Sequence, residues 1–501
     1  MLAACVAGAV LWRAPWLVFT ELNWDESLYR LIGDALLHGH APYAAIWDRK
    51  PAGLFVLVAL VQAVAGPGAL ALHLAAAVAV GLGAWCLAGI ARVLLPGLAL
   101  AGPVAAVLWI VYADRSGGTG ANAELFFVPL NLAGFWLMLG ARGMPGLFGA
   151  GLLLGAALQV KYNAAFIWPA CGLGWLLLSR RPVATWRAAV AVGLGAALPT
   201  LAVLGWYALV GRLGDWASAN LAAQGDTLRT AFGVDPDMLP FALRRYALPV
   251  AGTVLALAWL ACRAERRFAA VLVAWLAGDA LALWFLHRLA DHMMIQILPP
   301  LCLGTGWAAA RALQAMPSGR WRAGVAALAA LAWLGWSGRD SARPFAAAAE
   351  VLARRQGGDG ANWGDPTATA GALLAGRLAP DETIYVFGGP ILGIYQAAGR
   401  APPTRFPFAE HLWSGYAPVD GQAELARILA TRPAFIAVAG SWAPGKPSPP
   451  GGERVFAAMH AALAQDYVPD AAIPPYVSRA GGPIGPRETI LLFRRRYMPP
   501  G

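Results

Sequence analysis

The chain has 501 residues, of which 59% are hydrophobic and only 13% are charged, a composition too apolar for a soluble globular protein. Repeated apolar runs approach the roughly 20 residues that span a bilayer, so the sequence predicts a polytopic membrane protein. The formal net charge of +11 comes from basic residues in short clusters between these runs. Such clusters are typical of the cytoplasmic loops of membrane proteins, so the charge does not favour a nucleic-acid-binding protein.

The cysteines and lysines indicate the compartment. All 5 cysteines lie in apolar runs without a CxxC pair, so neither disulfide bonds nor a thiolate metal site is predicted. The only lysines are Lys50, Lys161 and Lys446, and this arginine bias is typical of a GC-rich bacterial genome. We therefore expect a bacterial inner-membrane protein. Residues 2–19 lack a basic n-region, so we expect a retained first span rather than a cleaved signal peptide.

Residues 20–68 form the predicted first loop, which is the most polar part of the membrane half. Its charged and aromatic side chains include Glu21, Asp25, Glu26, Asp34, Asp48, Arg49 and Lys50, with Trp24, Tyr29, Tyr43 and Trp47. Residues 52–65 are apolar but too short for a span and end at Gly66-Pro67-Gly68. They predict an interfacial helix, so the whole loop stays on one side of the membrane.

With residues 52–65 outside the bilayer, the apolar runs predict about eleven spans. They are expected near residues 2–19, 69–92, 97–113, 124–141, 146–161, 163–179, 187–210, 246–262, 268–286, 293–313 and 321–337. Basic and non-basic connections alternate, and the positive-inside rule places the arginine-rich ones in the cytoplasm. Residues 1–337 are thus a predicted membrane domain with a cytoplasmic N-terminus, and the first loop is periplasmic.

Residues 338–501 differ in character, because proline, glycine and charged residues increase and no spanning run remains. Short β-type runs at 383–389, 435–440 and 489–493 alternate with helical patterns at 422–430 and 454–465. This alternation predicts a periplasmic α/β domain. Gly388-Gly389-Pro390 follows a predicted strand but lacks the GxGxxG spacing, so nucleotide binding is not supported.

Under this topology, several ionisable residues converge on one membrane face. They are Asp25, Asp48 and Lys50 in the first loop, Glu124 in the second, Lys161 in the third, and His292 with Gln296 one helical turn later. Polar residues at membrane depth are costly and tend to be functional, so we predict a site there.

The chemistry of a lipid-phosphate donor suits these residue types. Asp25 could take the proton of an acceptor hydroxyl, and Lys50, Lys161, Arg49 or His292 could neutralise the departing phosphate. Asp25 and Glu124 could also hold a divalent metal, since Mg²⁺ and Mn²⁺ prefer hard oxygen ligands.

The run NWDESLY, followed by GHAPY and WDRKP, resembles the first periplasmic loop of GT-C glycosyltransferases. These are the polyprenyl-phosphate-sugar-dependent enzymes akin to the protein O-mannosyltransferases and the aminoarabinose transferase of lipid A. Similar segments are ANAELFF (121–127), GLLLGAALQVKYNA (151–164) and DHMMIQILPPL (291–301), the last resembling the pattern HYFxQLLPxL.

The resemblance implies a GT-C fold of membrane helices with a C-terminal soluble domain. It implies that Asp25 is the catalytic base, that Glu124 is the second-loop acid, and that Lys50 contacts the donor phosphate. Glu26, Tyr43, Asp48 and Gln296 would support them. The sequence departs from the pattern with PAG after Lys50, with Met293-Met294 in place of Tyr-Phe, and with Glu rather than Asp at position 124.

Each candidate residue also has a structural alternative. Asp25 could cap a helix over residues 26–37, and Glu26 could be a solvated acid in its first turn. Lys50 and Lys161 could extend to the membrane interface, and His292 could be a satisfied polar residue between helices. Asp235-Pro236-Asp237 has the DxD spacing of soluble glycosyltransferases, although such a short motif with proline favours a turn.

The sequence therefore predicts an inverting glycosyltransferase that moves a sugar from undecaprenyl phosphate to a periplasmic acceptor. The acceptor could be lipid A, another glycolipid, a polymer or a protein hydroxyl. One alternative is a transporter or flippase of a lipid-linked substrate, which would favour charged or broken helices at mid-membrane. The other is a non-catalytic GT-C scaffold.

Overall fold

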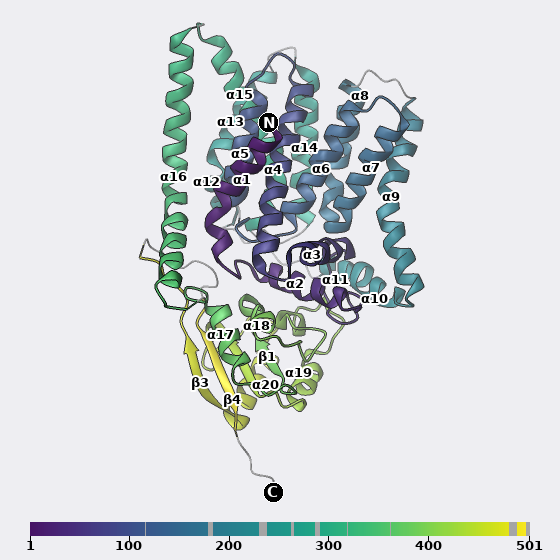
Figure 1. Ribbon diagram of the computed structural model, residues 1–501. Coiled ribbons are helices and arrows are strands. Elements are labelled where there is room, and N and C mark those ends of the chain that lie inside the picture. The colour runs from purple at the N-terminus through teal and green to yellow at the C-terminus, as the bar shows by residue number, and fades with distance from the viewer. Residues whose placement is uncertain are drawn as a thin grey trace.

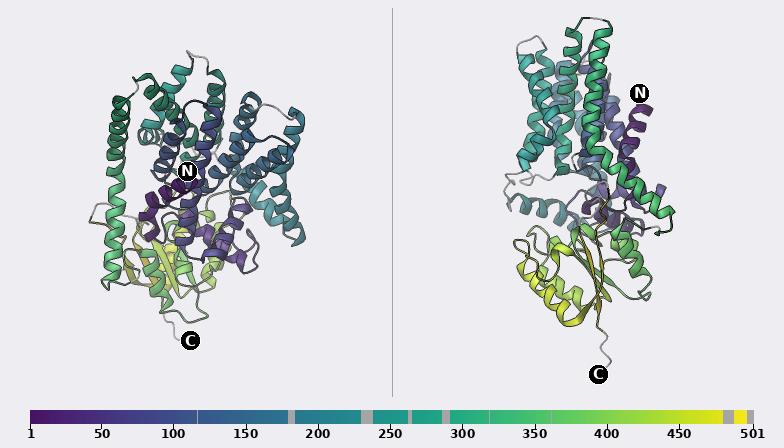
Figure 2. Two further views of the ribbon diagram at one scale, coloured as in Figure 1. Left: turned by 45° about the horizontal axis from the view of Figure 1, so that its top comes forward. Right: turned by 90° about the vertical axis from the view of Figure 1, so that its left-hand side faces the viewer.

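The computed structural model has two parts, a bundle of helices and a smaller α/β domain at one end of it (Figure 1). It describes residues 1–115, 117–178, 184–229, 238–261, 265–285, 291–317, 319–360, 362–479 and 488–496. The N-terminus lies against the bundle (Figures 1 and 2).

The bundle is formed by long apolar helices that run roughly side by side. They are α1 (Leu2–Arg13), α4 (Ala69–Leu94), α5 (Ala101–Arg115), α6 (Glu124–Gly140), α7 (Met144–Val160), α8 (Trp168–Leu178), α9 (Thr185–Leu209), α13 (Ala247–Ala261), α14 (Arg266–Phe285), α15 (Leu298–Ala315) and α16 (Arg320–Gln356). Short 3-10 segments extend three of them: η1 (Ala14–Val18), η2 (Tyr162–Ile167) and η4 (Asp291–Ile297).

Each predicted span coincides with one of these helices, although α16 continues well past the predicted end at residue 337, so the presence of the helices is confirmed. By length and composition, four described helices could cross a membrane: α4, α9, α14 and the continuous run Asp291–Ala315. The total of about eleven crossings stays a prediction. Small residues allow close packing in the bundle, as in membrane helices generally. A side chain at Gly151 or Gly155 of α7 would collide with the backbone of α9 at Val192 or Ala196.

Short helices gather where the bundle meets the α/β domain. They are α2 (Trp24–Leu37), α3 (Ala52–Ala65), α10 (Leu213–Ala217), α11 (Ala223–Arg229) and α12 (Met238–Arg245). The helix α3 lies beside α2 at this end of the bundle, as expected for a helix that does not cross the membrane (Figure 1). Its exposed apolar side chains include Val56, Leu60 and Val64, which suits an interfacial position.

The α/β domain contains one mixed four-stranded sheet. Its strands are β1 (Ile384–Phe387), β2 (Phe435–Ala439), β3 (Tyr467–Ile473) and β4 (Ile490–Arg495), in the order β1-β2-β4-β3. The pair β1 and β2 is parallel, and β4 pairs antiparallel with β2 and β3. Its helices are α17 (Pro366–Ala375), α18 (Ile394–Ala397), α19 (Gly421–Ala430) and α20 (Glu453–Asp466), with 3-10 segments η5 (Gly389–Ile391), η6 (Ala409–Leu412) and η7 (Gly440–Trp442).

The predicted strands and helices of this domain are confirmed, but β3 was not predicted. Its sequence, YVPDAAI, contains a proline and an aspartate that disfavour a strand, and a register shift at Pro469 accommodates the proline. The proposed boundary at residue 338 falls inside α16, which continues to Gln356. Asp235-Pro236-Asp237 lies outside the described residues.

Candidate active site

The candidate active site begins at the N-terminus of α2. Asn23 caps this helix, because its side-chain oxygen accepts the Asp25 N–H at 2.8 Å and Glu26 closes the capping box. Asp25 therefore does not cap the helix, which corrects that alternative. Its carboxylate is free to point toward the bundle, where other side chains reach it.

Two side chains contact the Asp25 carboxylate. The Tyr29 hydroxyl, one helical turn later, donates a hydrogen bond to Oδ2 at 3.2 Å, and Lys50 Nζ lies 3.5 Å from Oδ1. Burial raises the pKa of Asp25, but the charges of Lys50, His292 and Lys161 outweigh burial and lower it to about 2. Asp25 is therefore ionised at neutral pH, as a general base must be.

Lys50 is held by the first loop on several sides. Its Nζ lies 3.3 Å from Asp48 Oδ2 and 4.9 Å from the centre of the Tyr29 ring. The Tyr43 hydroxyl donates to the Lys50 carbonyl at 2.7 Å, and Tyr43 adopts a positive φ of 67°, which is uncommon for a bulky residue. Burial lowers the pKa of Lys50, but Asp25 and Asp48 raise it by more. Lys50 is therefore a paired cation rather than an interfacial one.

A second carboxylate–lysine pair lies at the neighbouring helix ends. Glu124, the first residue of α6, forms an ion pair with Lys161, which directly follows α7. Glu124 is 2% exposed and Lys161 13% exposed, so this pair is largely removed from solvent. His292 in η4 is close enough for its charge to act on Asp25. The structure thus brings together candidates from four separate segments.

Glu26 is completely buried, which corrects the alternative of a solvated acid. Its Oε1 accepts the Leu22 N–H at 2.7 Å, and its Oε2 accepts the Ala121 N–H of the second loop at 2.7 Å. His73 Nε2 of α4 lies 3.0 Å from the same Oε2. Glu26 therefore fastens the start of α2 to the second loop and to α4, and it positions the neighbouring Asp25.

Two candidates lie outside this cluster. The Gln296 amide donates to the Asp279 carbonyl of α14 at 3.2 Å and so does not reach the carboxylates. The Arg49 guanidinium lies over the Tyr416 ring, 4.3 Å from its centre, toward the α/β domain. Among residues that the sequence did not single out, Asn220 accepts hydrogen bonds from the Tyr43 and Tyr162 hydroxyls. No sequence pattern indicated a role for Asn220. The hydrogen bond from Tyr29 to Asp25 could have been predicted, because the two residues are spaced i, i+4 on one helix.

The carboxylates proposed as metal ligands, Asp25 and Glu124, are not arranged to bind a metal ion. Asp25 and Glu124 each have a lysine ammonium at the position that a cation would take. Among the described residues, no three His, Cys, Asp or Glu side chains come together as possible ligands. The reaction that we propose for these residues therefore has no metal-dependent step.

The fold of this chain is similar to that of two membrane proteins whose structures contain a polyprenyl phosphate. One similar structure is ArnT from Cupriavidus metallidurans bound to undecaprenyl phosphate, with a TM-score of 0.63, 15% identity, and coverage of 98% of this chain and 97% of that one. The apo state of the same ArnT gives a TM-score of 0.60 at 14% identity, again covering 98% and 97%.

A third structure is the archaeal oligosaccharyltransferase AglB from Archaeoglobus fulgidus, in complex with an inhibitory peptide and a dolichol-phosphate. Its TM-score is 0.53 at 12% identity, covering 88% of this chain and 69% of that one. No protein-family model and no curated protein matches the chain. These similarities establish the fold, and they confirm the resemblance predicted from the first-loop motif.

Proposed function

We propose that this protein is an inverting glycosyltransferase that moves a sugar from a polyprenyl phosphate, undecaprenyl phosphate in a bacterium, to a hydroxyl group of a periplasmic-side acceptor. The observation that carries this proposal is the juxtaposition of two carboxylate–lysine pairs, Asp25 with Lys50 and Glu124 with Lys161, at one end of the helical bundle. A base for the acceptor and cations for a phosphate are then adjacent, as the reaction requires.

In the proposed reaction, Asp25 accepts the proton of the acceptor hydroxyl as its oxygen attacks the anomeric carbon. The bond between that carbon and the phosphate oxygen breaks, and its electron pair leaves with the lipid phosphate. Lys50 and Lys161 stabilise the negative charge that develops on the phosphate. Attack opposite the leaving group inverts the anomeric configuration.

Donor binding would also raise the pKa of Asp25, the proposed base. A carboxylate with a pKa of about 2 is ionised but is a weak proton acceptor. A donor phosphate next to Lys50 and Lys161 would neutralise the cations that lower this pKa. The pKa of Asp25 then rises toward the working pH only when the donor is in place, which limits proton abstraction to the loaded enzyme.

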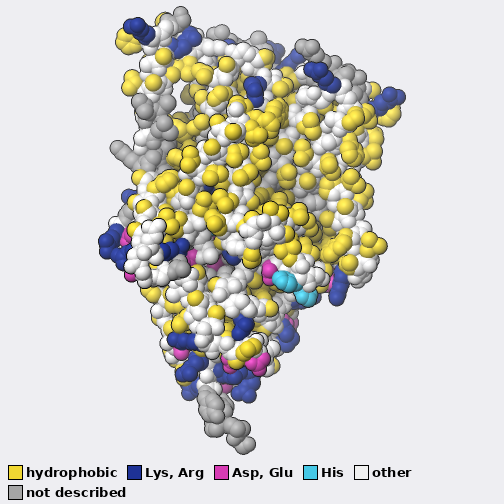
Figure 3. Space-filling view, viewed as in Figure 1, with side chains coloured by type: hydrophobic (Ala, Val, Ile, Leu, Met, Phe, Trp, Pro, Cys, Tyr) yellow, Lys and Arg dark blue, Asp and Glu magenta, His cyan; other side chains and the backbone are white. Residues whose placement is uncertain are grey.

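The charge distribution favours a periplasmic site. Basic side chains gather at the end of the bundle opposite the α/β domain, with an apolar belt between the two ends (Figure 3). The positive-inside rule assigns that basic end to the cytoplasm of an inner membrane. The clustering of ionisable groups at one interface also favours an enzyme over a transporter, whose charges would line the mid-membrane.

The experiment that tests this function is lipid mass spectrometry of cells that lack the protein, complemented with the wild type, with Asp25→Asn, or with an empty vector. The amide keeps the shape of the side chain but cannot take a proton, so transfer should fall at least about 100-fold. We expect an undecaprenyl-phosphate sugar to accumulate in the deletion strain and in the Asp25→Asn strain, and its mass would identify the donor sugar.

The control is the amount of monodisperse Asp25→Asn protein after purification, which should match the wild type because Lys50 still pairs with Asp48 in this variant. An unchanged polyprenyl pool in all strains would favour the transporter or scaffold alternatives. Wild-type transfer by the Asn variant would remove Asp25 as the base.

A further inference from the structure

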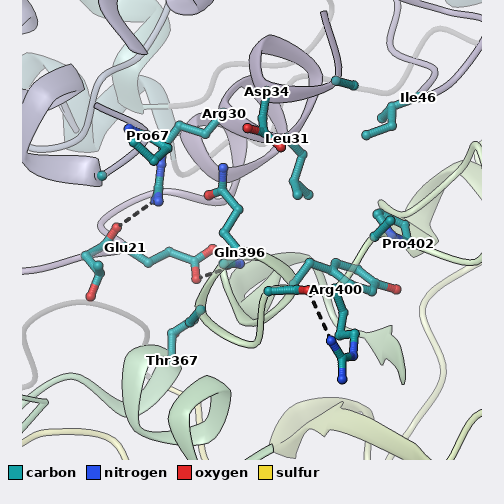
Figure 4. A pocket seen from close by; sticks show the side chains of 18 of the residues that line it. Glu21, Arg30, Leu31, Asp34, Ile46, Pro67, Thr367, Gln396, Arg400 and Pro402 are labelled. Atoms are coloured by element: carbon teal, nitrogen blue, oxygen red, sulfur yellow. Dashed lines mark hydrogen bonds between the residues drawn. The ribbon is translucent and has the colours of Figure 1, made fainter. Parts of the chain in front are cut away.

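A second concave site lies between α2 and the α/β domain (Figure 4). The cavity has a volume of about 660 Å³, within the range of roughly 300–1,000 Å³ that is usual for small-molecule sites. Its polar lining comes from both parts of the chain: Glu21, Arg30, Asp34, Thr367, Gln396 and Arg400. Arg30 follows Asp25 by five positions, a rotation of about 140° around the helix. The cavity and the candidate active site therefore use different faces of α2.

Two side chains in the cavity wall lack partners. Both amide atoms of Gln396 and the hydroxyl of Thr367 are buried, and none has a hydrogen-bond partner among the described residues. Thr367 is only 1% exposed. Figure 4 shows the Gln396 side chain extending into the space between α2 and Arg400. Buried polar groups are nearly always hydrogen-bonded, so these atoms call for a partner that the described residues do not supply.

Glu21, Arg30 and Arg400 are also incompletely satisfied, and for the two arginines the atom without a hydrogen-bond partner among the residues described is Nε. Oε2 of Glu21 accepts the Gly393 N–H at 3.2 Å, whereas its Oε1 has no hydrogen-bond partner among the residues described. The Ser27 hydroxyl lies near enough to lower the pKa of Glu21 but falls short of hydrogen-bond geometry. Burial is the stronger influence and raises this pKa to about 8. Glu21 is then mostly a neutral acid at pH 7, with an O–H to donate.

These groups match a polyhydroxylated ligand. A planar amide and a carboxylic acid each pair a donor with an acceptor, which suits neighbouring hydroxyl groups. Leu31, Ile46 and Pro402 provide apolar surface for the C–H face of a sugar ring. The lining also includes the guanidinium groups of Arg30 and Arg400 beside the carboxyl group of Asp34, so an anion such as phosphate is the competing ligand to test.

We propose that this cavity binds a neutral sugar unit of the acceptor, one that is remote from the hydroxyl reacting at Asp25. The acceptor role rests on the proposed function, whereas sugar binding itself needs no turnover. Because both amide atoms of Gln396 lie just beneath the cavity wall, binding requires a small rotation of this side chain. A ligand there would bridge the first loop and the α/β domain across α2.

The test is sugar binding by the purified full-length protein, measured by saturation-transfer NMR and titration. The probes are glucose, galactose, mannose and N-acetylglucosamine, with inorganic phosphate as the competing chemistry. We expect at least one sugar to bind the wild type, with a Kd that rises about tenfold in Gln396→Leu and severalfold in the isosteric Thr367→Val. The melting temperature should stay the same or rise in both variants, because each removes an unpartnered buried polar group.

Gln422→Leu is the matched control, because Gln422 is an exposed glutamine in α19 of the same domain. This variant and Asp25→Asn should bind sugar like the wild type. The proposal is overturned if no sugar binds, if phosphate binds instead, or if Thr367→Val and Gln396→Leu bind like the control. Should Gln396→Leu fail to fold, Thr367→Val alone decides. Sugar binding without transfer would contradict the proposed function only, and transfer without sugar binding would contradict the cavity site only.

Discussion

The charged side chains of the candidate site are held in lysine–carboxylate ion pairs. Lys50 contacts both Asp25 and Asp48, and Lys161 contacts Glu124, so each of these three carboxylates has a lysine ammonium beside it. Removing one member of such a pair leaves a charge with little solvent to stabilise it, which costs more than the pair itself contributes. The same cations are the ones that the donor phosphate would recruit. The proposed catalysis and the stability of the fold therefore depend on the same residues.

The protonation of Glu21 predicts how the stability of the folded protein depends on pH. The native pKa of Glu21 is about 8, whereas an unfolded glutamate titrates near about 4.3. Between these values the native state holds a proton that the unfolded state has lost. The stability that this proton contributes is fully present below the unfolded pKa, and it is lost as pH rises through the native one. The slope contributed by Glu21 reaches at most about 1.4 kcal/mol per pH unit.

We expect Glu21→Gln to flatten this decline, because the amide does not titrate. The measurement is thermal or denaturant unfolding of the detergent-solubilised protein from about pH 5 to about pH 8, the window between the unfolded and native pKa values. Glu453→Gln is the control, since Glu453 is an exposed glutamate of α20 and its variant should keep the wild-type slope. Equal slopes in all three proteins would contradict the assignment of a protonated Glu21.

Among the elements, the segment around residues 405–416 connects the α/β domain to the first loop. The backbone N–H of Trp47 donates to the Arg405 carbonyl at 2.7 Å, and the completely buried Trp47 ring packs against Phe406, His411 and Tyr416. Trp47 lies immediately before the run from Asp48 to Lys50. The α/β domain therefore supports the backbone that carries Arg49 and Lys50, the cations proposed to bind the donor.

Substitution of Tyr416 tests whether the α/β domain supports the first loop. The Arg49 guanidinium lies over the Tyr416 ring, 4.3 Å from its centre. Tyr416→Leu should raise the KM for the lipid-linked donor by roughly twofold to thirtyfold, the range for losing a cation–π contact of about 0.5–2 kcal/mol. Tyr416→Phe keeps the ring and should remain near the wild type. The measurement is steady-state transfer with varied donor concentration. Equal KM values in the two variants would show that the ring does not position Arg49.

At the scale of the whole molecule, orientation decides which substrates can reach the site. The first loop and the α/β domain share one end of the bundle, while the connection between α6 and α7 lies at the other end (Figures 1 and 3). If the positive-inside rule holds, the first faces the periplasm and the second faces the cytoplasm. Only a donor with its sugar on the periplasmic side could then react.

Cysteine labelling checks this orientation. In a background without native cysteines, His40→Cys in the first loop should react with a membrane-impermeant maleimide added to intact spheroplasts. Arg142→Cys, between α6 and α7, should react only after the membrane is permeabilised. Neither position is fully buried, so access to the reagent depends on the side of the membrane. The reverse pattern would overturn the predicted topology and place the site in the cytoplasm.

Local patterns in the sequence determined much of this protein by themselves. The apolar runs predicted the positions of the bundle helices, because a membrane helix satisfies its own backbone hydrogen bonds and needs only length and hydrophobicity. The period-2 and helical patterns also predicted three of the four strands and two of the helices of the α/β domain. The first-loop motif indicated the class of fold.

Only the tertiary structure decided which polar groups meet. The pairing of Lys50 with Asp25 and of Lys161 with Glu124, the burial of Glu26 against His73, and the cavity between α2 and the α/β domain all join segments far apart in sequence. Side-chain contacts of this kind depend on how the helices pack, and sequence spacing does not encode packing across distant segments. For the same reason, the sequence could not distinguish Gln296, which faces α14, from the residues that form the site.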